Sequence, residues 1–455
     1  MNIEEIKNIS LDQLIALGDF DCSCGKKHSP GVKRVSIGKN ALSRLPEYLT
    51  ELNSSKPFII SGHDSYGAAG DKVCTILRKS GFEYSKYVFP ESPVKPTEHT
   101  VGSSIMHFDF TCDSIIGVGS GVINDTAKIL AHTTGRRYIA VATAPSMDGF
   151  VSGTSSMDRD GLKVSLYSTA PWAVIGDLDI LQAAPLHLLR AGIGDMLAKI
   201  ISLREWELAR IIVGEYFCPI TAALVQRAVD RVLKYSSGLE KRDPETISAI
   251  MEGLLMAGIA MNYAGMSRPA SGMEHYFSHI WDMRSLAFHD AKCEQHGIQA
   301  GLGTLYSLQA YESFLKYCKS PDKEKALNYV SSFSLDSWNE RLLDFVGPGA
   351  NAMIEGDRRE KKYDLQKHSL RLKLIFDNWN EIVGIISSLP SSKEIRELMI
   401  SLGLPCSAAV IGYSNSQVKT TFTMTKDIRD KYIGSRLFWD LGVLDEIADA
   451  AFAEN

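Results

Sequence analysis

Short apolar runs alternate with helix-like patterns over the first 180 residues. The runs predict buried strands at 56–62, 84–89, 113–117, 138–143 and 173–177, with helices at 66–80 and 122–132, the second of which ends at Gly135. A hairpin is expected between 152 and 167, turning at 158–161. Strands that alternate with helices are typical of βαβ units. We therefore expect an α/β, Rossmann-like domain built on a parallel sheet.

The pattern changes after Pro185. Apolar residues recur every three or four positions over 197–213, 218–236, 245–263 and 297–318, which is the spacing of helices with one buried face. The sequence therefore predicts two domains, a Rossmann-like domain at 1–180 and an all-α domain at 181–455.

Composition narrows the class of protein. The chain has 455 residues, a net charge of −5 and eight cysteines, mostly scattered singly. The charge gives no general attraction to nucleic acid or anionic membranes, and scattered cysteines favour a reducing compartment over a disulfide framework. The N-terminus lacks a signal-peptide pattern, and no apolar run reaches 18 residues. We expect a cytoplasmic protein without nucleic-acid partners or stable membrane insertion.

A glycine-rich turn follows the strand at 113–117. Gly117, Gly119 and Gly121 leave backbone N–H groups open to a pyrophosphate at a helix N-terminus, but the spacing departs from GxGxxG, and a tight turn explains it too. After Gly119, Ser120 and Gly121, the helix continues with Asn124, Asp125 and Lys128. Those three residues either contact the cofactor or have only the structural roles that are common in the first turns of a helix.

Two aspartates follow other predicted strands. Asp64 caps the next helix or bonds a cofactor ribose. Asp148 lies in a Pro-Ser-Met-Asp-Gly loop at the carboxyl end of a strand, where open α/β sheets bind ligands. It is a turn residue or, as we prefer, a group that contacts a substrate hydroxyl or relays a proton.

Asp195, His275 and His296 form a third set. One carboxylate and two imidazoles suit a divalent metal that keeps a coordination position open for a substrate oxygen. Taken singly, each has a structural explanation, because Asp195 could cap a helix and either histidine could be a bonded core residue.

These residues carry a resemblance. The chain resembles the glycerol-1-phosphate dehydrogenase family, within the superfamily of glycerol dehydrogenases, iron-type alcohol dehydrogenases and dehydroquinate synthases. The resemblance covers about 30–310 and rests on Gly119–Lys128, Thr143–Gly149, Gly194-Asp195, Ser267–His275, Ser278-His279 and His296-Gly297.

The resemblance implies a metal bound in a cleft between the two domains by Asp195, His275 and His296. It also implies that the Gly119–Gly121 loop, Asn124, Asp125 and Lys128 lie along the cofactor phosphates, that Thr143 and Ser146 lie near the nicotinamide, and that Asp148 contacts substrate. Iron-type alcohol dehydrogenases have a fourth ligand, a histidine, where this chain has Lys199. A three-ligand site favours zinc or nickel over iron.

The expected reaction is reduction of dihydroxyacetone phosphate to sn-glycerol 1-phosphate with NAD or NADP. Lys199, Arg268 and His279 are candidates for contact with the substrate phosphate, or else pair between helices. Asp64 would favour NAD by repelling a 2′-phosphate. The alternatives are a dehydrogenase of unphosphorylated glycerol or another polyol, a dehydroquinate-synthase-like cyclase and a non-catalytic regulatory protein. The family further suggests phospholipid biosynthesis. We also expect a homo-oligomer, in the form of a dimer, for which the helical tail after about residue 320 could form the surface.

Cys22, Cys24 and His28 lie within seven residues near the N-terminus. They could bind an ion, but the Cys-x-Cys spacing is too tight for a usual zinc knuckle and a fourth ligand is missing. A small hairpin with packed cysteines is the alternative that we favour.

Overall fold

The computed structural model describes residues 3–159, 162–289 and 294–453. The chain forms two compact units. Unit 1 comprises Met1–Asp160, Val164–Met196 and Pro219–Met266, and unit 2 comprises Gly161–Lys163, Leu197–Cys218 and Ser267–Asn455. The chain therefore passes between the units several times. The predicted domain border at 180 stays a prediction; the last strand among the described residues ends at Asp177.

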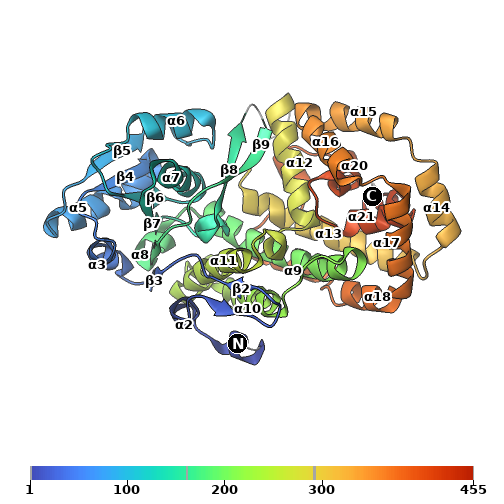
Figure 1. Ribbon diagram of the computed structural model, residues 1–455, viewed down its shortest axis with the longest axis horizontal. Helices are drawn as coiled ribbons and strands as arrows, with labels where there is room; N and C mark the ends of the chain where they lie inside the picture. The colour runs from blue at the N-terminus through green and yellow to red at the C-terminus, as the bar shows by residue number, and fades with distance from the viewer. Residues whose placement is uncertain (1–2, 160–161, 290–293, 454–455) are drawn as a thin grey trace. The chain divides into compact units, whose positions relative to one another are not determined.

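Unit 1 is built on a parallel sheet of six strands (Figure 1). Their order is β3 (Arg34–Gly38), β10 (Ala173–Asp177), β7 (Arg137–Ala142), β6 (Ser114–Gly119), β4 (Pro57–Gly62) and β5 (Ser85–Phe89). This confirms the predicted α/β architecture and its five strands. Strand β3 was not predicted; its first residue is exposed and the other four are only partly buried.

Helices cover both faces of the sheet because successive strand residues point to opposite sides. On one face, β-strand residues including Ile116 and Val118 share a core with α3 (Leu45–Glu51), α5 (Asp71–Lys79) and α8 (Leu178–Ala183). On the other face, α7 (Gly121–Thr134) packs against β6, β7 and β4. Gly135 ends α7 as predicted, with φ of 66°, a left-handed conformation that glycine adopts readily.

The order of the strands contains a switch point. From β4 the chain moves outward to β5, then returns to form β6 on the other side of β4. The loops that leave the carboxyl ends of β4 and β6 therefore diverge, and in open α/β sheets ligands bind where they do so. Asp64 follows β4 and the Gly119–Gly121 loop follows β6.

The predicted hairpin is present as β8 (Thr154–Arg159) and β9 (Leu162–Tyr167), which pair in a two-stranded sheet. Its predicted turn includes residues 160–161, which lie outside the described residues.

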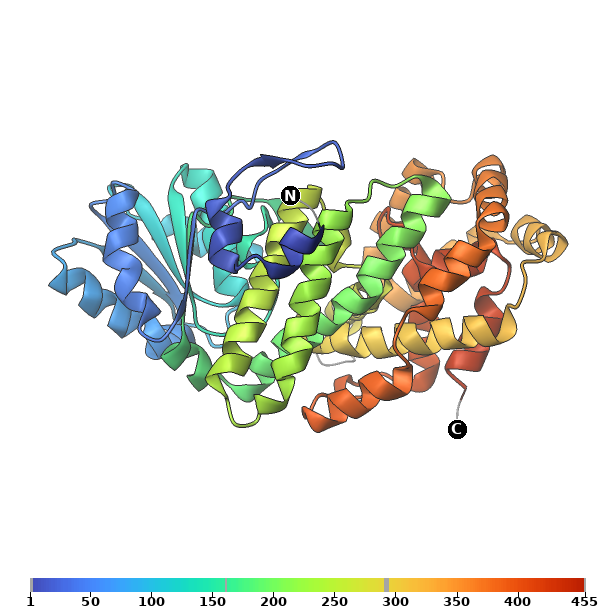
Figure 2. The same cartoon turned by 90° about the horizontal axis from the view of Figure 1, so that it is seen from below.

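Two long helices, α10 (Pro219–Tyr235) and α11 (Pro244–Ala264), complete unit 1 and lie side by side in Figure 2. Helix α11 is long and apolar enough to cross a membrane, but 78% of its most apolar window is buried inside the protein. Burial of that kind is expected of a core helix.

Unit 2 is helical over its described residues after position 196. It contains the second half of α9 (Leu186–Val213), together with α12 (Met273–Phe288) and α13 (His296–Tyr317), which pack against each other. The rest of the chain adds α14 (Lys323–Ser331), α15 (Leu335–Val346), α16 (Ala350–Glu360), α17 (Leu365–Asp377), α18 (Trp379–Ser387), α19 (Ser392–Ser401), α20 (Asn415–Met424), α21 (Gly434–Asp440) and α22 (Leu444–Ala451). The predicted all-α second half is confirmed.

Candidate functional site

The three glycines at the end of β6 have different surroundings. A Cβ on Gly117 would lie 2.7 Å from the ring of Tyr138, and one on Gly119 would lie 2.5 Å from Cβ of Ile123. Gly117 and Gly119 are therefore required by the packing of α7 on the sheet. A Cβ on Gly121 would meet only Met147, at 3.8 Å, so packing does not require glycine there. Gly121 is thus the position where a close approach by a ligand would explain the missing side chain.

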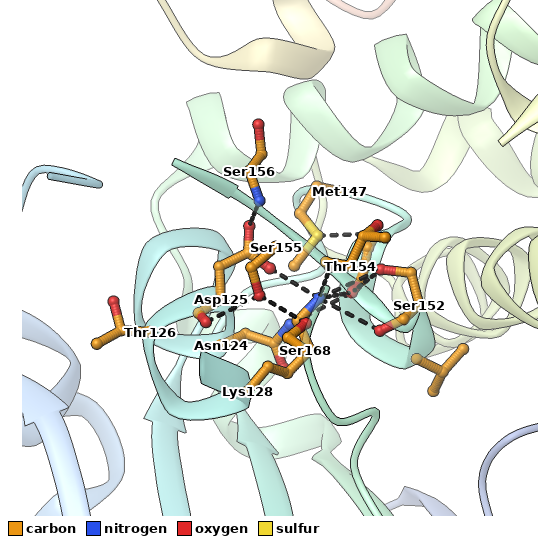
Figure 3. Close-up of polar contacts among 12 residues, drawn as sticks. Asn124, Asp125, Thr126, Lys128, Met147, Ser152, Thr154, Ser155, Ser156 and Ser168 are labelled. Carbon is orange, nitrogen blue, oxygen red and sulfur yellow. Dashed lines mark hydrogen bonds and ion pairs between the residues drawn. The ribbon is translucent and has the colours of Figure 1, made fainter. Parts of the chain in front are cut away.

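Lys128 lies in the middle of a buried network (Figure 3). Its side chain is 0% exposed, and its ammonium group pairs with Asp125 at 2.8 Å. It also donates to the carbonyl oxygens of Gly149 and Thr154 and to Oγ of Ser152. These contacts use the hydrogen-bonding capacity of the ammonium group, and they fix the segment that follows the Asp148 loop.

Asn124 and Asp125 bond to the same segment. Asn124 donates to the carbonyl of Gly149 at 3.3 Å and accepts from the hydroxyl of Tyr138. Asp125 accepts from the backbone N–H of Ser156 at 2.9 Å. Asn124, Asp125 and Lys128, which we expected along the cofactor phosphates, thus hold residues 149–156 against α7.

Asp64 has an open setting. Its side chain is 76% exposed and accepts a hydrogen bond from Oγ of Ser92 at 2.6 Å. That bond lowers the pKa of Asp64 from its usual value. The neighbouring Ser65 donates to the carbonyl of Val118 in β6, so Asp64 lies at the switch point beside the glycine loop.

Asp195 lies inside a helix. Helix α9 begins at Leu186, so the helix-cap explanation of Asp195 is wrong. Its side chain is buried, and one carboxylate oxygen accepts from the backbone N–H of Asp148 at 2.9 Å. One turn earlier, a Cβ on Gly192 would lie 2.0 Å from the carbonyl oxygen of Pro145, so glycine allows α9 to touch the Asp148 loop. This contact brings together two predicted site segments, Thr143–Gly149 and Gly194-Asp195. In the first segment, Thr143 and Ser146 are buried.

His275 has a carboxylate partner. Its Nδ1 lies 2.8 Å from Oε1 of Glu274, and a carboxylate oxygen can only accept, so Nδ1 carries the proton. The lone pair is then on Nε2. Histidines that bind metals almost always donate their other N–H to a carboxylate or carbonyl in this way. Glu274 is fully buried and also accepts from the N–H of Gly272 at 2.6 Å, which fixes its position.

His296 is oriented in a similar way at the start of α13. Its Nδ1 lies 3.2 Å from Oγ of Ser278, and that hydroxyl donates to Oε1 of Gln299. Because the proton of Ser278 is used by Gln299, the serine accepts from Nδ1–H, and Nε2 again has the lone pair. The ring centroids of His275 and His296 are 5.0 Å apart, and their ligand atoms are within 4.8 Å. Unit 2 therefore presents two imidazoles suited to one ion.

The three residues expected at the substrate phosphate are all buried. Arg268 donates to the carbonyls of Glu205 and Tyr432 and pairs with Glu215 at 3.2 Å, so its contacts are structural. His279 is enclosed, and burial holds its pKa well below the usual range, which disfavours the charged imidazolium. Lys199 is 0% exposed on α9.

Sequence reasoning missed Lys431. It donates to Oγ of Ser267 and to the carbonyl of Ser271, both at 2.9 Å, on the segment that leads to His275. Burial, followed by the charge of Arg268, lowers its pKa to about 7. No spacing in the sequence could have indicated it, because Lys431 is 160 residues from Ser271.

Residues 36–185 and the overall fold both have known counterparts. The model of the iron-containing alcohol dehydrogenase family matches residues 36–185. Among solved structures, a probable glycerol dehydrogenase from Sinorhizobium meliloti aligns with a TM-score of 0.57 at 16% identity, over 92% of this chain and 98% of that one. A 1,3-propanediol oxidoreductase also aligns with a TM-score of 0.57, at 15% identity, over 91% of this chain and 98% of that one. These likenesses show the fold.

Curated relatives are more specific. A glycerol-1-phosphate dehydrogenase [NAD(P)+] from Halalkalibacterium halodurans is 27% identical over 90% of this chain and 93% of its own length. One from Staphylothermus marinus is 34% identical over 61% of this chain and 77% of its own length. One from Bacillus subtilis is 32% identical over 64% of this chain and 74% of its own length. The chain therefore belongs to the glycerol-1-phosphate dehydrogenase family of NAD(P)-dependent enzymes.

Proposed function

We propose that the chain is a metal-dependent, NAD(P)-linked dehydrogenase that reduces dihydroxyacetone phosphate to sn-glycerol 1-phosphate. Family membership supports the reaction class and the phosphorylated substrate. The observation that carries the metal dependence is the orientation of His275 and His296, because the Nδ1 atom of each ring bonds within the protein, which makes Nε2 the metal-binding atom of both rings.

We propose Asp195 as the third ligand. Helix α9 is unbroken from Leu186 to Val213, so Asp195 and Ser202, which are seven positions apart, are separated by about two turns and lie on one side of the helix. Ser202 donates to the carbonyl of Pro269, just before the segment that ends in His275. One carboxylate and two imidazoles fit zinc or nickel, and Lys199 occupies the position of a fourth ligand.

A divalent metal at these residues would supply Lewis acidity to the substrate carbonyl. The protein would position the reactants around it. The N–H of Asp148 holds one oxygen of Asp195, which orients that carboxylate. Asp148 itself is half-buried at the carboxyl end of β7, and we propose that it contacts a substrate hydroxyl or relays the proton to the product oxygen.

The cofactor is proposed to bind at the switch point between β4 and β6. Gly121 would allow its phosphates to approach the N-terminus of α7, and Thr143 and Ser146 would line the nicotinamide side. Asn124, Asp125 and Lys128 would act indirectly, by holding residues 149–156. The exposed Asp64 would favour NAD over NADP, because its charge repels a 2′-phosphate.

The surroundings of Arg268 and His279 do not favour direct contact with the substrate phosphate. Arg268 is paired with Glu215, and burial disfavours the charged form of His279. Lys199 stays our proposal for that contact. A cytoplasmic location, a homodimer and a place in phospholipid biosynthesis also stay predictions.

Cofactor oxidation, followed by the loss of its absorbance, tests the proposal. Protein stripped of metal is given zinc or nickel and offered dihydroxyacetone phosphate or dihydroxyacetone. Metal-dependent turnover of the phosphorylated ketone alone is expected. Turnover of dihydroxyacetone alone would instead assign a glycerol dehydrogenase, and turnover without metal would refute the role of Asp195, His275 and His296.

A further inference from the structure

A second group of metal-binding side chains lies near the N-terminus, in unit 1. Strands β1 (Phe20–Asp21) and β2 (Lys27–His28) pair antiparallel. Their connection is a tight turn in which Cys22 donates its N–H to the carbonyl of Lys26 and Gly25 donates to the carbonyl of Cys22. Gly25 has φ of 87°, a conformation that glycine permits. Because the chain turns tightly here, the two thiols of the closely spaced Cys-x-Cys pair can lie on the same side of the hairpin.

The hairpin brings three ligand atoms together. The ligand atoms of Cys22, Cys24 and His28 lie within 4.8 Å of one another, and Sγ of Cys24 is 3.4 Å from Nε2 of His28. Neither cysteine is in a disulfide. Zinc–sulfur and zinc–nitrogen bonds are about 2.3 and 2.0 Å, so ligand atoms around one zinc are separated by roughly 3 to 4 Å. The observed separations need little adjustment to hold an ion.

His28 is oriented as a ligand. Its side chain is 0% exposed, and its Nδ1 lies 3.0 Å from the carbonyl oxygen of Tyr263 at the end of α11. A carbonyl only accepts, so Nδ1 carries the proton and Nε2 presents its lone pair to the cysteines. Stacking on the ring of Tyr263 at 4.8 Å and an edge contact with Phe20 hold the imidazole plane.

The chain supplies a fourth ligand beyond the hairpin. Helices α10 and α11 are consecutive and joined by a short connection at 236–243, so the start of α10 lies at the same end of the pair as the end of α11. Cys218 immediately precedes Pro219, the first residue of α10. The peptide bond therefore puts this buried thiol at the end where Tyr263 holds His28.

Other bonds fix the hairpin at this end. Lys26 donates to the carbonyl of Ala264 at 3.0 Å, and Asn262 donates to the carbonyl of Pro30 at 2.9 Å. Figure 2 shows the dark-blue hairpin near the end of the yellow-green helix pair that is opposite to the loop joining the two helices. These bonds hold the hairpin in a fixed position, although each of its strands has only two residues.

We propose that Cys22, Cys24, His28 and Cys218 bind one zinc ion, which fastens the N-terminal hairpin to the end of α10 and α11. Three thiolates and one imidazole form a closed tetrahedral set, which is the composition of structural zinc sites. This site differs in kind from the oxygen and nitrogen ligands proposed for the dehydrogenase metal. It also stands independently of the proposed reaction.

Cobalt substitution tests the proposal on the full-length protein. Cobalt bound by thiolates gives a sulfur-to-metal charge-transfer band, whereas cobalt bound by Asp195, His275 and His296 does not. We expect the band in the wild type and in Asp195→Asn, with its loss in Cys22→Ser and its weakening in Cys218→Ser. Cys318→Ser, which changes a thiol elsewhere, should keep the full band.

Zinc content provides the second measurement. Elemental analysis of protein prepared without chelator should find one zinc that Cys24→Ser loses and that Asp195→Asn keeps. Absence of the charge-transfer band in wild-type protein would overturn the proposal even if every cysteine variant failed to fold. A band or zinc content that is unchanged in both Cys22→Ser and Cys218→Ser would overturn it as well. Failure of the dehydrogenase assay leaves both results unaffected.

Discussion

Glu274 should control how tightly His275 binds its metal. Its Oε1 atom accepts from both the N–H of Gly272 and Nδ1–H of His275, at 2.6 and 2.8 Å. A glutamine at this position offers one amide oxygen in the same place, so both bonds can persist while the negative charge is lost. Glu274→Gln therefore isolates the effect of charge on the imidazole.

The expected size follows from these contacts. Loss of a partner that orients a metal ligand costs about 10- to 100-fold in metal affinity, or ~1.4–2.8 kcal/mol. We expect Glu274→Gln near the lower end because its oxygen can still accept. Glu274→Ala should be near the upper end and less stable, because it leaves two N–H groups unsatisfied where Glu274 is 0% exposed, at about 1–3 kcal/mol each.

Competition against a chromophoric chelator would measure zinc affinity, and thermal unfolding of the metal-free protein would measure stability. Glu215→Gln is the matched control. It removes a negative charge that pairs with Arg268 and leaves Glu274 in place, so zinc affinity should change little. Equal affinity in wild type, Glu274→Gln and Glu274→Ala would refute the assignment of Glu274 as the partner of a metal ligand.

Three further predictions concern unit 1 and the C-terminal helices. Lys128→Met should destabilise the protein by about 3–5 kcal/mol in urea unfolding, because it leaves the carboxylate of Asp125, which is only 14% exposed, without its positively charged partner. A loss under 1 kcal/mol would contradict this. Gly119→Ala should lower the free energy of unfolding by about 1–3 kcal/mol through overpacking, whereas Gly121→Ala should leave that free energy unchanged and raise KM for the cofactor. A larger loss of stability in Gly121→Ala than in Gly119→Ala would contradict the proposed roles of the two glycines. Burial, followed by the charge of Asp427, raises the pKa of Asp357 from 3.8 to about 7. The folded state then holds a proton that the unfolded chain releases, so this stabilisation is present below pH 3.8 and is lost as the pH rises to about 7. Asp357→Asn should therefore reduce the fall in unfolding free energy over that range, and an unchanged pH profile would contradict the assignment.

Local patterns in the sequence were sufficient to predict five of the six strands of the sheet. Apolar runs and glycine punctuation indicated β4, β5, β6, β7 and β10, because buried strands and helix ends leave signals within a few residues. Strand β3 has only partly buried residues and gave no such signal. The proposed metal ligands Asp195, His275 and His296 were identified by their ligand chemistry together with the resemblance to the family.

The detailed contacts of the site were harder to predict. Lys128 has the sequence neighbours of a phosphate-binding lysine, yet, besides pairing with Asp125, it donates to the carbonyls of Gly149 and Thr154, which are more than 20 residues away. Arg268 meets the carbonyl of Tyr432, 164 residues later in the chain. Pairings at such separations depend on the packing of whole helices, so residue type and spacing alone do not reveal them.

The uninterrupted α9 helix has a consequence for biogenesis. Its second half belongs to a unit whose other main part begins at Ser267, so it leaves the ribosome long before its partners. Glu205 on this half accepts from the N–H of Gly434, 229 residues later, and from the hydroxyl of Tyr311. Until the last helices are synthesised, a carboxylate destined for complete burial stays hydrated. Unit 2 can therefore mature only after residue 434 has been synthesised, and a nascent chain that stops before this residue should be a client of chaperones rather than a partly active enzyme.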